Sequence, residues 1–76
     1  MAMAYLRVWV FSGKEAAVQA ALRKVKGVKS AHLTAGDQDV MVLLEGKSYE
    51  DILCTVLQRV RGIEGIRGTA TNLVLE

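Results

Sequence analysis

The sequence is poor in the residues that form covalent or metal cross-links. Its 76 residues include one cysteine, one histidine and no proline. One cysteine excludes an intrachain disulfide, and no Cys or His spacing matches a zinc site, so we expect neither a metal nor a cofactor. No apolar run approaches the roughly eighteen residues of a membrane-spanning helix, and the N-terminus lacks the basic region and cleavage site of a signal peptide. We therefore expect a cytoplasmic protein that does not contact a membrane.

Charge of one sign is also scarce. Ten lysine and arginine residues face eight acidic residues, the formal net charge is +2, and the two signs alternate along the chain. Nucleic-acid interfaces need a clustered basic patch, so this distribution argues against direct DNA binding. Apolar residues, in contrast, make up 51% of the chain. A single domain of this size (residues 1–76) buries a modest core, and without disulfides or metals we expect association to stabilise it.

The pattern of apolar residues predicts six elements in the order β-α-β-β-α-β. Gly27 is expected to end the first helix, and the segment from Gly62 to Gly65 the second. Each helix should begin at a serine, with Ser12 and Glu15 forming a capping box and Ser48 capping the second helix. The expected strands span residues 4–11, 28–35, 40–45 and 66–75.

The two halves of the chain resemble each other. Each helix is preceded by a strand and a Gly-Lys pair, and is followed by a glycine, an aliphatic residue and a base. These segments are Gly13-Lys14 with Gly27-Val28-Lys29, and Gly46-Lys47 with Gly65-Ile66-Arg67. The pseudo-repeat predicts an α+β, ferredoxin-like fold, in which a four-stranded antiparallel sheet carries two helices on one face. Because neither Gly-Lys pair has the Walker pattern, we interpret both as helix-entry turns and not as phosphate loops.

Apolar residues are expected on both faces of this sheet. In the first strand aliphatic residues alternate with Tyr5, Trp9 and Phe11, and the third strand places Met41 opposite its aliphatic face. A sheet with helices on one side should present a polar second face to water, so this apolar second face indicates association. The simplest solution is a homodimer whose sheets pack face to face through Tyr5, Trp9, Phe11 and Met41. Base stacking is the weaker interpretation, because Arg7 is the single charge among these aromatic residues.

Two groups of polar residues are candidates for a binding site. The string Gly36-Asp37-Gln38-Asp39 lies between two apolar runs and is typical of a β-hairpin turn. Its two acidic groups also suit a small cation, such as the ammonium group of an amino acid. Thr69 and Thr71 lie on one face of the last strand, where paired hydroxyls suit a carboxylate, although threonine is also an ordinary strand residue.

Cys54 and His32 are weaker candidates. Cys54 lies between apolar neighbours in the second helix with no evident base nearby, so we expect a buried structural thiol and not a nucleophile. His32 is expected to be a surface or interface histidine. Catalysis by His32 together with an acid from the hairpin remains an alternative at this stage.

Short motifs along nearly the whole chain carry a family resemblance. They are the helix end Val25-Lys26-Gly27-Val28-Lys29, the strand from Ala31 to Ala35, the hairpin from Gly36 to Val42, the turn from Val60 to Arg67 and the last strand from Thr69 to Leu75. The Gly-x-x-Asp hairpin followed by a late Thr-x-Thr strand is the more specific combination. In these motifs the chain resembles the effector-binding domain of the Lrp/AsnC transcriptional regulators, often called the RAM domain.

The resemblance implies a dimer formed by sheet packing, of the dimeric α+β barrel type, and assembly of dimers into octamer-like oligomers. It also implies an amino-acid effector held between dimers, with the site formed by Gly36, Asp37, Asp39, Thr69 and Thr71. Carboxylates would pair with the ammonium group of the effector through charge-assisted hydrogen bonds.

The chain also departs from the usual pattern of that family. A helix-turn-helix domain normally precedes this one, whereas here the first strand begins almost at Met1. The chain therefore resembles a stand-alone sensor domain, with a full-length Lrp/AsnC regulator as a possible protein partner. The family usually has Tyr at the position of Gln38, so the resemblance does not imply which amino acid is bound.

Three alternatives stay open. A ligand-free structural oligomerisation module would keep the fold and the apolar sheet face and bind no effector. A small cofactor-free enzyme of the dimeric α+β barrel type would place His32 beside an acid in a closed pocket. Within the sensor class, the ACT domains share the same strand order and also bind amino acids.

Overall fold

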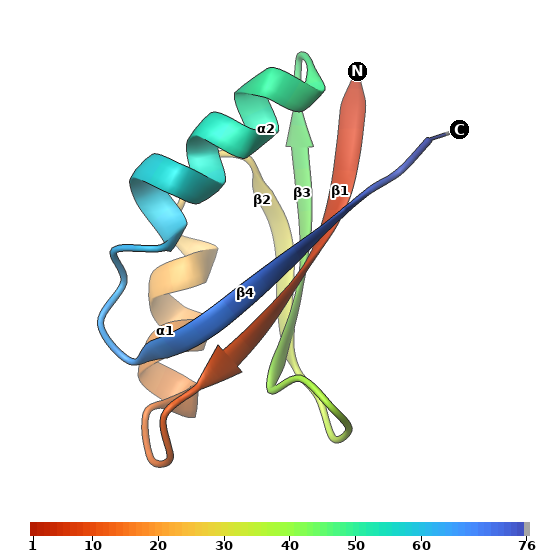
Figure 1. Ribbon diagram of the computed structural model, residues 1–76. Helices are drawn as coiled ribbons and strands as arrows, with labels where there is room; N and C mark the ends of the chain where they lie inside the picture. Colours follow the sequence, from red (N-terminus) through yellow and green to blue (C-terminus); the bar gives the residue numbers. More distant parts are fainter. Residues whose placement is uncertain (76) are drawn as a thin grey trace.

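The computed structural model describes residues 1–75 and contains the expected order of elements (Figure 1). The second helix continues into a π-helical turn, labelled η1. The elements are β1 (Ala2–Val10), α1 (Glu15–Arg23), β2 (Val28–Leu33), β3 (Val40–Gly46), α2 (Tyr49–Thr55), η1 (Val56–Val60) and β4 (Ile66–Leu73).

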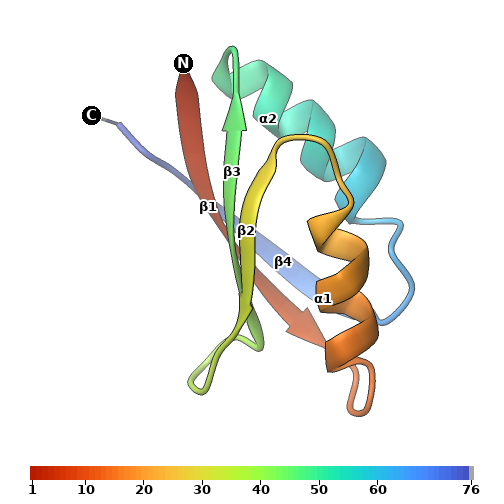
Figure 2. The same ribbon diagram turned by 180° about the vertical axis from the view of Figure 1, so that it is seen from behind.

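The four strands form one antiparallel sheet in the order β2-β3-β1-β4. Both helices cover the same face, and the other face carries no helix (Figures 1 and 2). The α+β, ferredoxin-like prediction is therefore confirmed. Strands β1, β2 and β4 end at Val10, Leu33 and Leu73, one or two residues before the expected positions.

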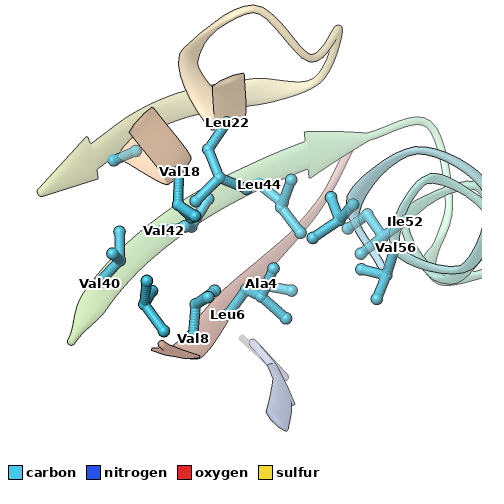
Figure 3. Close-up of a cluster of buried hydrophobic side chains, with 13 residues drawn as sticks. Ala4, Leu6, Val8, Val18, Leu22, Val40, Val42, Leu44, Ile52 and Val56 are labelled. Atoms are coloured by element: carbon cyan, nitrogen blue, oxygen red, sulfur yellow. The ribbon is translucent and has the colours of Figure 1, made fainter. Parts of the chain in front are cut away.

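The core lies between the helices and the covered face of the sheet. Alternate residues of β1 and β3 are buried, as their apolar pattern predicts. Figure 3 shows their side chains directed toward those of α1 and α2. The largest fully buried residues are Leu6, Val8, Val18, Leu22, Val40, Val42, Leu44, Ile52 and Val60.

One serine cap is present and the other is not. Ser48 accepts a hydrogen bond of 3.2 Å from the backbone N–H of Asp51, as expected. The capping box at Ser12 is wrong, because α1 begins at Glu15 after Lys14 with no side-chain cap. The backbone N–H of Lys14 instead bonds to the carbonyl of Phe11 at 3.0 Å, which closes a tight turn around Ser12. The Glu15 carboxylate accepts from the backbone N–H of Gly13 at 3.0 Å.

The second helix buries only part of its apolar residues. Ile52, Val56 and Val60 recur every four residues and face the sheet, whereas Leu53 is 43% exposed and Leu57 61% exposed. Cys54 is exposed, so the expected buried thiol is wrong. Cys54 follows the buried Ile52 by two residues, and an α-helix turns by about 200° over two residues. The Cys54 side chain therefore points away from the sheet.

One backbone carbonyl of β2, that of Ala31, is occupied by side chains of α1. Gln19 Nε2 donates to the carbonyl of Ala31 at 3.0 Å, and Arg23 Nε donates to the same oxygen at 3.1 Å. Such side-chain contacts occupy a backbone group that another strand would otherwise pair with. Among residues 1–75, no helix is long and apolar enough to cross a bilayer.

Candidate functional site

The loop between β2 and β3 closes the hairpin that the sequence predicts. The backbone N–H of Thr34 bonds to the carbonyl of Asp39 at 2.9 Å, and the Thr34 hydroxyl donates to the carbonyl of Gln38 at 3.0 Å. Gln38 returns a bond from its amide nitrogen to the Thr34 hydroxyl at 3.2 Å. Gly36 alone in this loop takes a positive φ, of 155°, which side-chain-bearing residues rarely adopt. The acidic loop (residues 34–39) is therefore an ordered structure.

Asp39 is part of the sheet as well as of the loop. Its Oδ2 accepts a bond of 2.7 Å from the backbone N–H of Val10, and its own N–H donates to the carbonyl of Val8 at 2.9 Å. The pairing of β3 with β1 begins at Val40. The Asp39 carboxylate thus satisfies a strand donor that β3 is too short to reach.

Asp37 is held from the uncovered face of the sheet. Arg7 Nη2 donates to its Oδ2 at 2.8 Å, and Trp9 Nε1 donates to its carbonyl at 2.8 Å. The Arg7 guanidinium also lies 5.0 Å from the centre of the Trp9 ring, in a cation–π arrangement. The Asp37 side chain remains 77% exposed, so it is accessible to a further molecule.

Thr69 and Thr71 share one face of β4, as the sequence predicts. They lie opposite Val8 and Leu6 of β1, which belong to the covered, core-facing side of the sheet. Arg7 and Trp9 alternate with those residues along β1 and so lie on the other side. The structure therefore separates the two threonines from the acidic loop within one subunit.

Thr69 does line a cleft of its own. This cleft has a volume of about 450 Å³, and its other lining residues are Arg61, Ile66, Arg67 and Gly68. The two guanidinium groups beside a hydroxyl suit an anionic group, because Arg and Thr both donate hydrogen bonds. The sequence places both arginines in the turn from Val60 to Arg67, but nothing in that motif predicted that they line a cleft.

The uncovered face carries the predicted apolar residues. Tyr5 is 46% exposed, and Trp9 and Met41 are half-buried. Phe11 lies one residue past β1 and is 55% exposed. His32 is exposed and pairs with Met41 across the sheet, which places it on this face as a surface residue.

The sequence did not predict that Arg7 and Trp9 hold the acidic loop. They lie 30 and 28 residues from Asp37, and nothing in local spacing pairs an arginine in one strand with a distant turn. The alternation of Arg7 and Trp9 with buried residues predicted which face of the sheet they occupy. Only the pairing of β1 with β3 brings them beside the acidic loop.

The order of elements, the antiparallel sheet and the strand register together define a small α+β domain of the ferredoxin-like class. Residues 3–76 match the model of the Lrp/AsnC ligand binding domain, and the chain belongs to that family. The resemblance drawn from its sequence is thereby confirmed.

One curated relative and two solved structures illustrate this similarity. Over 74 residues the chain is 34% identical to the HTH-type transcriptional regulator FL11 of Pyrococcus furiosus. The aligned residues make up 97% of this chain and 48% of the regulator. The hypothetical protein PHS023 from Pyrococcus horikoshii is 25% identical, with a TM-score of 0.91 over 100% of this chain and 92% of that one. The transcriptional regulator NMB0573 of Neisseria meningitidis, solved as a complex with L-Met, is 22% identical, with a TM-score of 0.85 over 99% of this chain and 50% of that one. The chain spans about half the length of the curated regulators that it matches.

Proposed function

We propose that the domain binds a small amino acid at an interface between its own copies, and that binding alters either its assembly or its contact with a regulator of the same family. The observation that carries the proposal is the division of polar groups within one subunit. The acidic loop lies on one side of the sheet and Thr69 and Thr71 on the other. A site that uses both groups needs a second copy of the chain.

The chemistry of the two groups is complementary to an amino acid. Asp39 uses Oδ2 to hold Val10, and no described residue donates to its other oxygen, which is free to accept from an ammonium group. Threonine hydroxyls and the backbone N–H groups near Gly36 can donate to an α-carboxylate. Exclusion of water between subunits would strengthen each of these hydrogen bonds.

Association through the uncovered face supplies the second copy. A patch that contains Tyr5, Trp9, Phe11 and Met41 is better buried than exposed, and a two-fold axis would place it against itself. Such dimers would assemble further, into an octamer-like oligomer, to bring loops and threonines of different dimers together. A ligand that contacts two dimers favours whichever oligomer forms its site.

Comparison with relatives supports this class of function. Curated relatives include transcriptional regulators, which supports a role other than catalysis; a homocitrate synthase also matches, but over only 13% of its length. One structural neighbour was solved with L-Met, so the fold is compatible with an amino-acid ligand. The enzyme alternative requires His32 beside an acid, whereas His32 is exposed on the sheet face and forms no hydrogen bond to an acid in residues 1–75.

One observation favours a second candidate, the ligand-free oligomerisation module. Both acids of the loop already have partners within the subunit, Asp37 in Arg7 and Asp39 in the Val10 N–H. In that case the presence of Asp37 and Asp39 is explained by the structure of the turn, without a ligand.

A thermal-shift screen of the twenty amino acids, with light scattering to report mass, separates the two candidates. A ligand that binds only the folded state raises stability by RT ln(1 + [L]/Kd). We expect one amino acid to raise the melting temperature of the wild type, and Asp39→Asn to abolish the shift. This variant keeps an oxygen for the Val10 N–H and removes the charge. Glu64→Gln, at an exposed acid elsewhere, is the matched control and should keep the shift.

A mass that matches an intact oligomer together with no shift for any amino acid would favour the ligand-free module. A shift that survives in Asp39→Asn would place the ligand away from the acidic loop.

A further inference from the structure

A cleft of about 560 Å³ lies at the end of the sheet remote from the acidic loop. It is formed where β2 begins, where β3 ends and along one side of α2 and η1. Gly46, at this end, pairs with Ala2, whereas the acidic loop adjoins Val8 and Val10 at the other end of β1. The charged residues that line this cleft are Lys26, Lys29, Glu45, Lys47, Asp51 and Arg59.

Most of the cations in this cleft have no acidic partner. Lys29 forms an ion pair with Glu45, with Nζ and Oε1 3.6 Å apart. The other ion pair in residues 1–75 is that of Arg7 and Asp37, so Lys26, Lys47 and Arg59 are not paired there. Like charges that face one cleft repel one another, and an anion bound between them relieves this repulsion.

A second cleft of about 500 Å³ shares Lys26 and Arg59 with the first and adds Lys24. The joined clefts contain five of the ten lysine and arginine residues but only two of the eight acidic residues. Their lining thus carries three net positive charges, more than the +2 of the whole chain. The remainder of the molecule is slightly acidic, so the joined clefts are its positive pole.

A close backbone contact holds together the two chain segments, residues 26–29 and 45–47, that line the first cleft. The backbone N–H of Glu45 donates to the carbonyl of Gly27 at 2.8 Å, and Gly27 has a φ of 100°. A Cβ at Gly27 would lie 3.1 Å from the carbonyl oxygen of Glu45, so a larger residue would push the strands apart. This contact holds the backbone that carries Lys26 and Lys29 beside the backbone that carries Lys47.

We propose that the joined clefts bind a small polyphosphate anion, such as the phosphate chain of a nucleotide. Several cations that line the same joined clefts match an anion with several charges better than a single carboxylate. Thr55 and Gln58 add hydrogen-bond donors, and Val25 and Val28 provide an apolar wall. Glu45 and Asp51 interrupt the positive surface, which disfavours the continuous backbone of a nucleic acid.

Isothermal titration calorimetry of the intact protein with inorganic tripolyphosphate, and separately with ATP, tests this proposal. We expect both anions to bind at low salt and adenosine not to bind. The double variant Lys26→Gln with Arg59→Gln removes the two cations shared by both clefts and should weaken binding on the order of tenfold or more, since each charged hydrogen bond contributes substantially. The double variant Lys14→Gln with Arg23→Gln removes the same charge at two exposed residues that line none of these clefts, and is the matched control.

Three results would overturn the proposal. The first is that neither tripolyphosphate nor ATP binds to protein that remains folded and assembled. Equal weakening in the control variant would mean that only net charge matters. Tighter binding of a DNA duplex than of ATP at the same salt concentration, lost in the Lys26/Arg59 variant, would assign the surface to nucleic acid. The amino-acid screen uses a different site, so its failure would not affect this result.

Discussion

The carboxylate of Asp39 and the backbone N–H of Val10 lie 2.7 Å apart, which joins the acidic loop to the strand at the centre of the sheet. The contact has a consequence for mutagenesis, because an alanine at this position removes a possible ligand group and a structural acceptor together. We therefore expect Asp39→Ala to destabilise the domain by about 1 to 3 kcal/mol, since the Val10 N–H loses its partner. Asp39→Asn keeps an acceptor and should cost clearly less. Urea denaturation measures both, and equal losses would contradict this role of the oxygen.

The ion pair of Arg7 and Asp37 should affect order more than stability. Both side chains are partly exposed, at 33% and 77%, so solvent screens their attraction. We expect Arg7→Ala to change the free energy of unfolding by less than about 1 kcal/mol. Hydrogen exchange at residues 34–39 should nevertheless become faster, because the variant loses the bonds to Asp37 and Gln38. Lys29→Ala, which breaks the other ion pair, is the control and should leave exchange in this loop unchanged.

The uncovered sheet face can be tested by placing a charge within it. We expect Tyr5→Glu to lower the mass measured by light scattering, because an unpaired carboxylate would be buried in a face-to-face dimer. Leu57 is a matched control, since it is an apolar residue of η1 that is 61% exposed and lies in the helical layer. Loss of mass in Leu57→Glu and not in Tyr5→Glu would mean that copies associate through the helices instead.

Two glycines that flank the same turn should differ in their tolerance of alanine. Gly65 has a φ of 101°, and a Cβ there would lie 2.9 Å from side-chain atoms of Lys14 and Val18. We expect Gly65→Ala to destabilise the domain by about 2 kcal/mol or more, through backbone strain together with overpacking. Gly62 has no atom within 4 Å of such a Cβ, so Gly62→Ala should stay within about 0.5 kcal/mol of the wild type. Chemical denaturation curves of the two variants provide the comparison.

The sequence predicted those features that depend on local periodicity. Alternation in β1 gave both the core and the apolar second face, and Ser48 followed by Asp51 gave the start of α2. It failed where a neighbouring turn changes the local geometry. Ser12 has the right spacing for a capping box, but Gly13 bends the chain into a tight turn before the helix begins.

Features formed by distant segments could not be predicted in the same way. The basic residues alternate with acids along the chain, which argued against a basic patch. In the structure, Lys24, Lys26 and Lys29 lie near Lys47 and Arg59, which come from segments further along the chain. The position of Cys54 required knowledge of which helical stripe meets the sheet, since apolar residues lie on both sides of it.

The side chains of Gln19 and Arg23 on the Ala31 carbonyl limit how copies of this domain can join by backbone pairing. A sheet grows into a filament only if both of its edges accept a strand from the next molecule. An incoming strand at the β2 edge would find this backbone acceptor already occupied, so continuous pairing there is disfavoured, whereas the β4 edge can still join two molecules. The domain can therefore expose an apolar sheet face for assembly while one of its edges resists fibre growth.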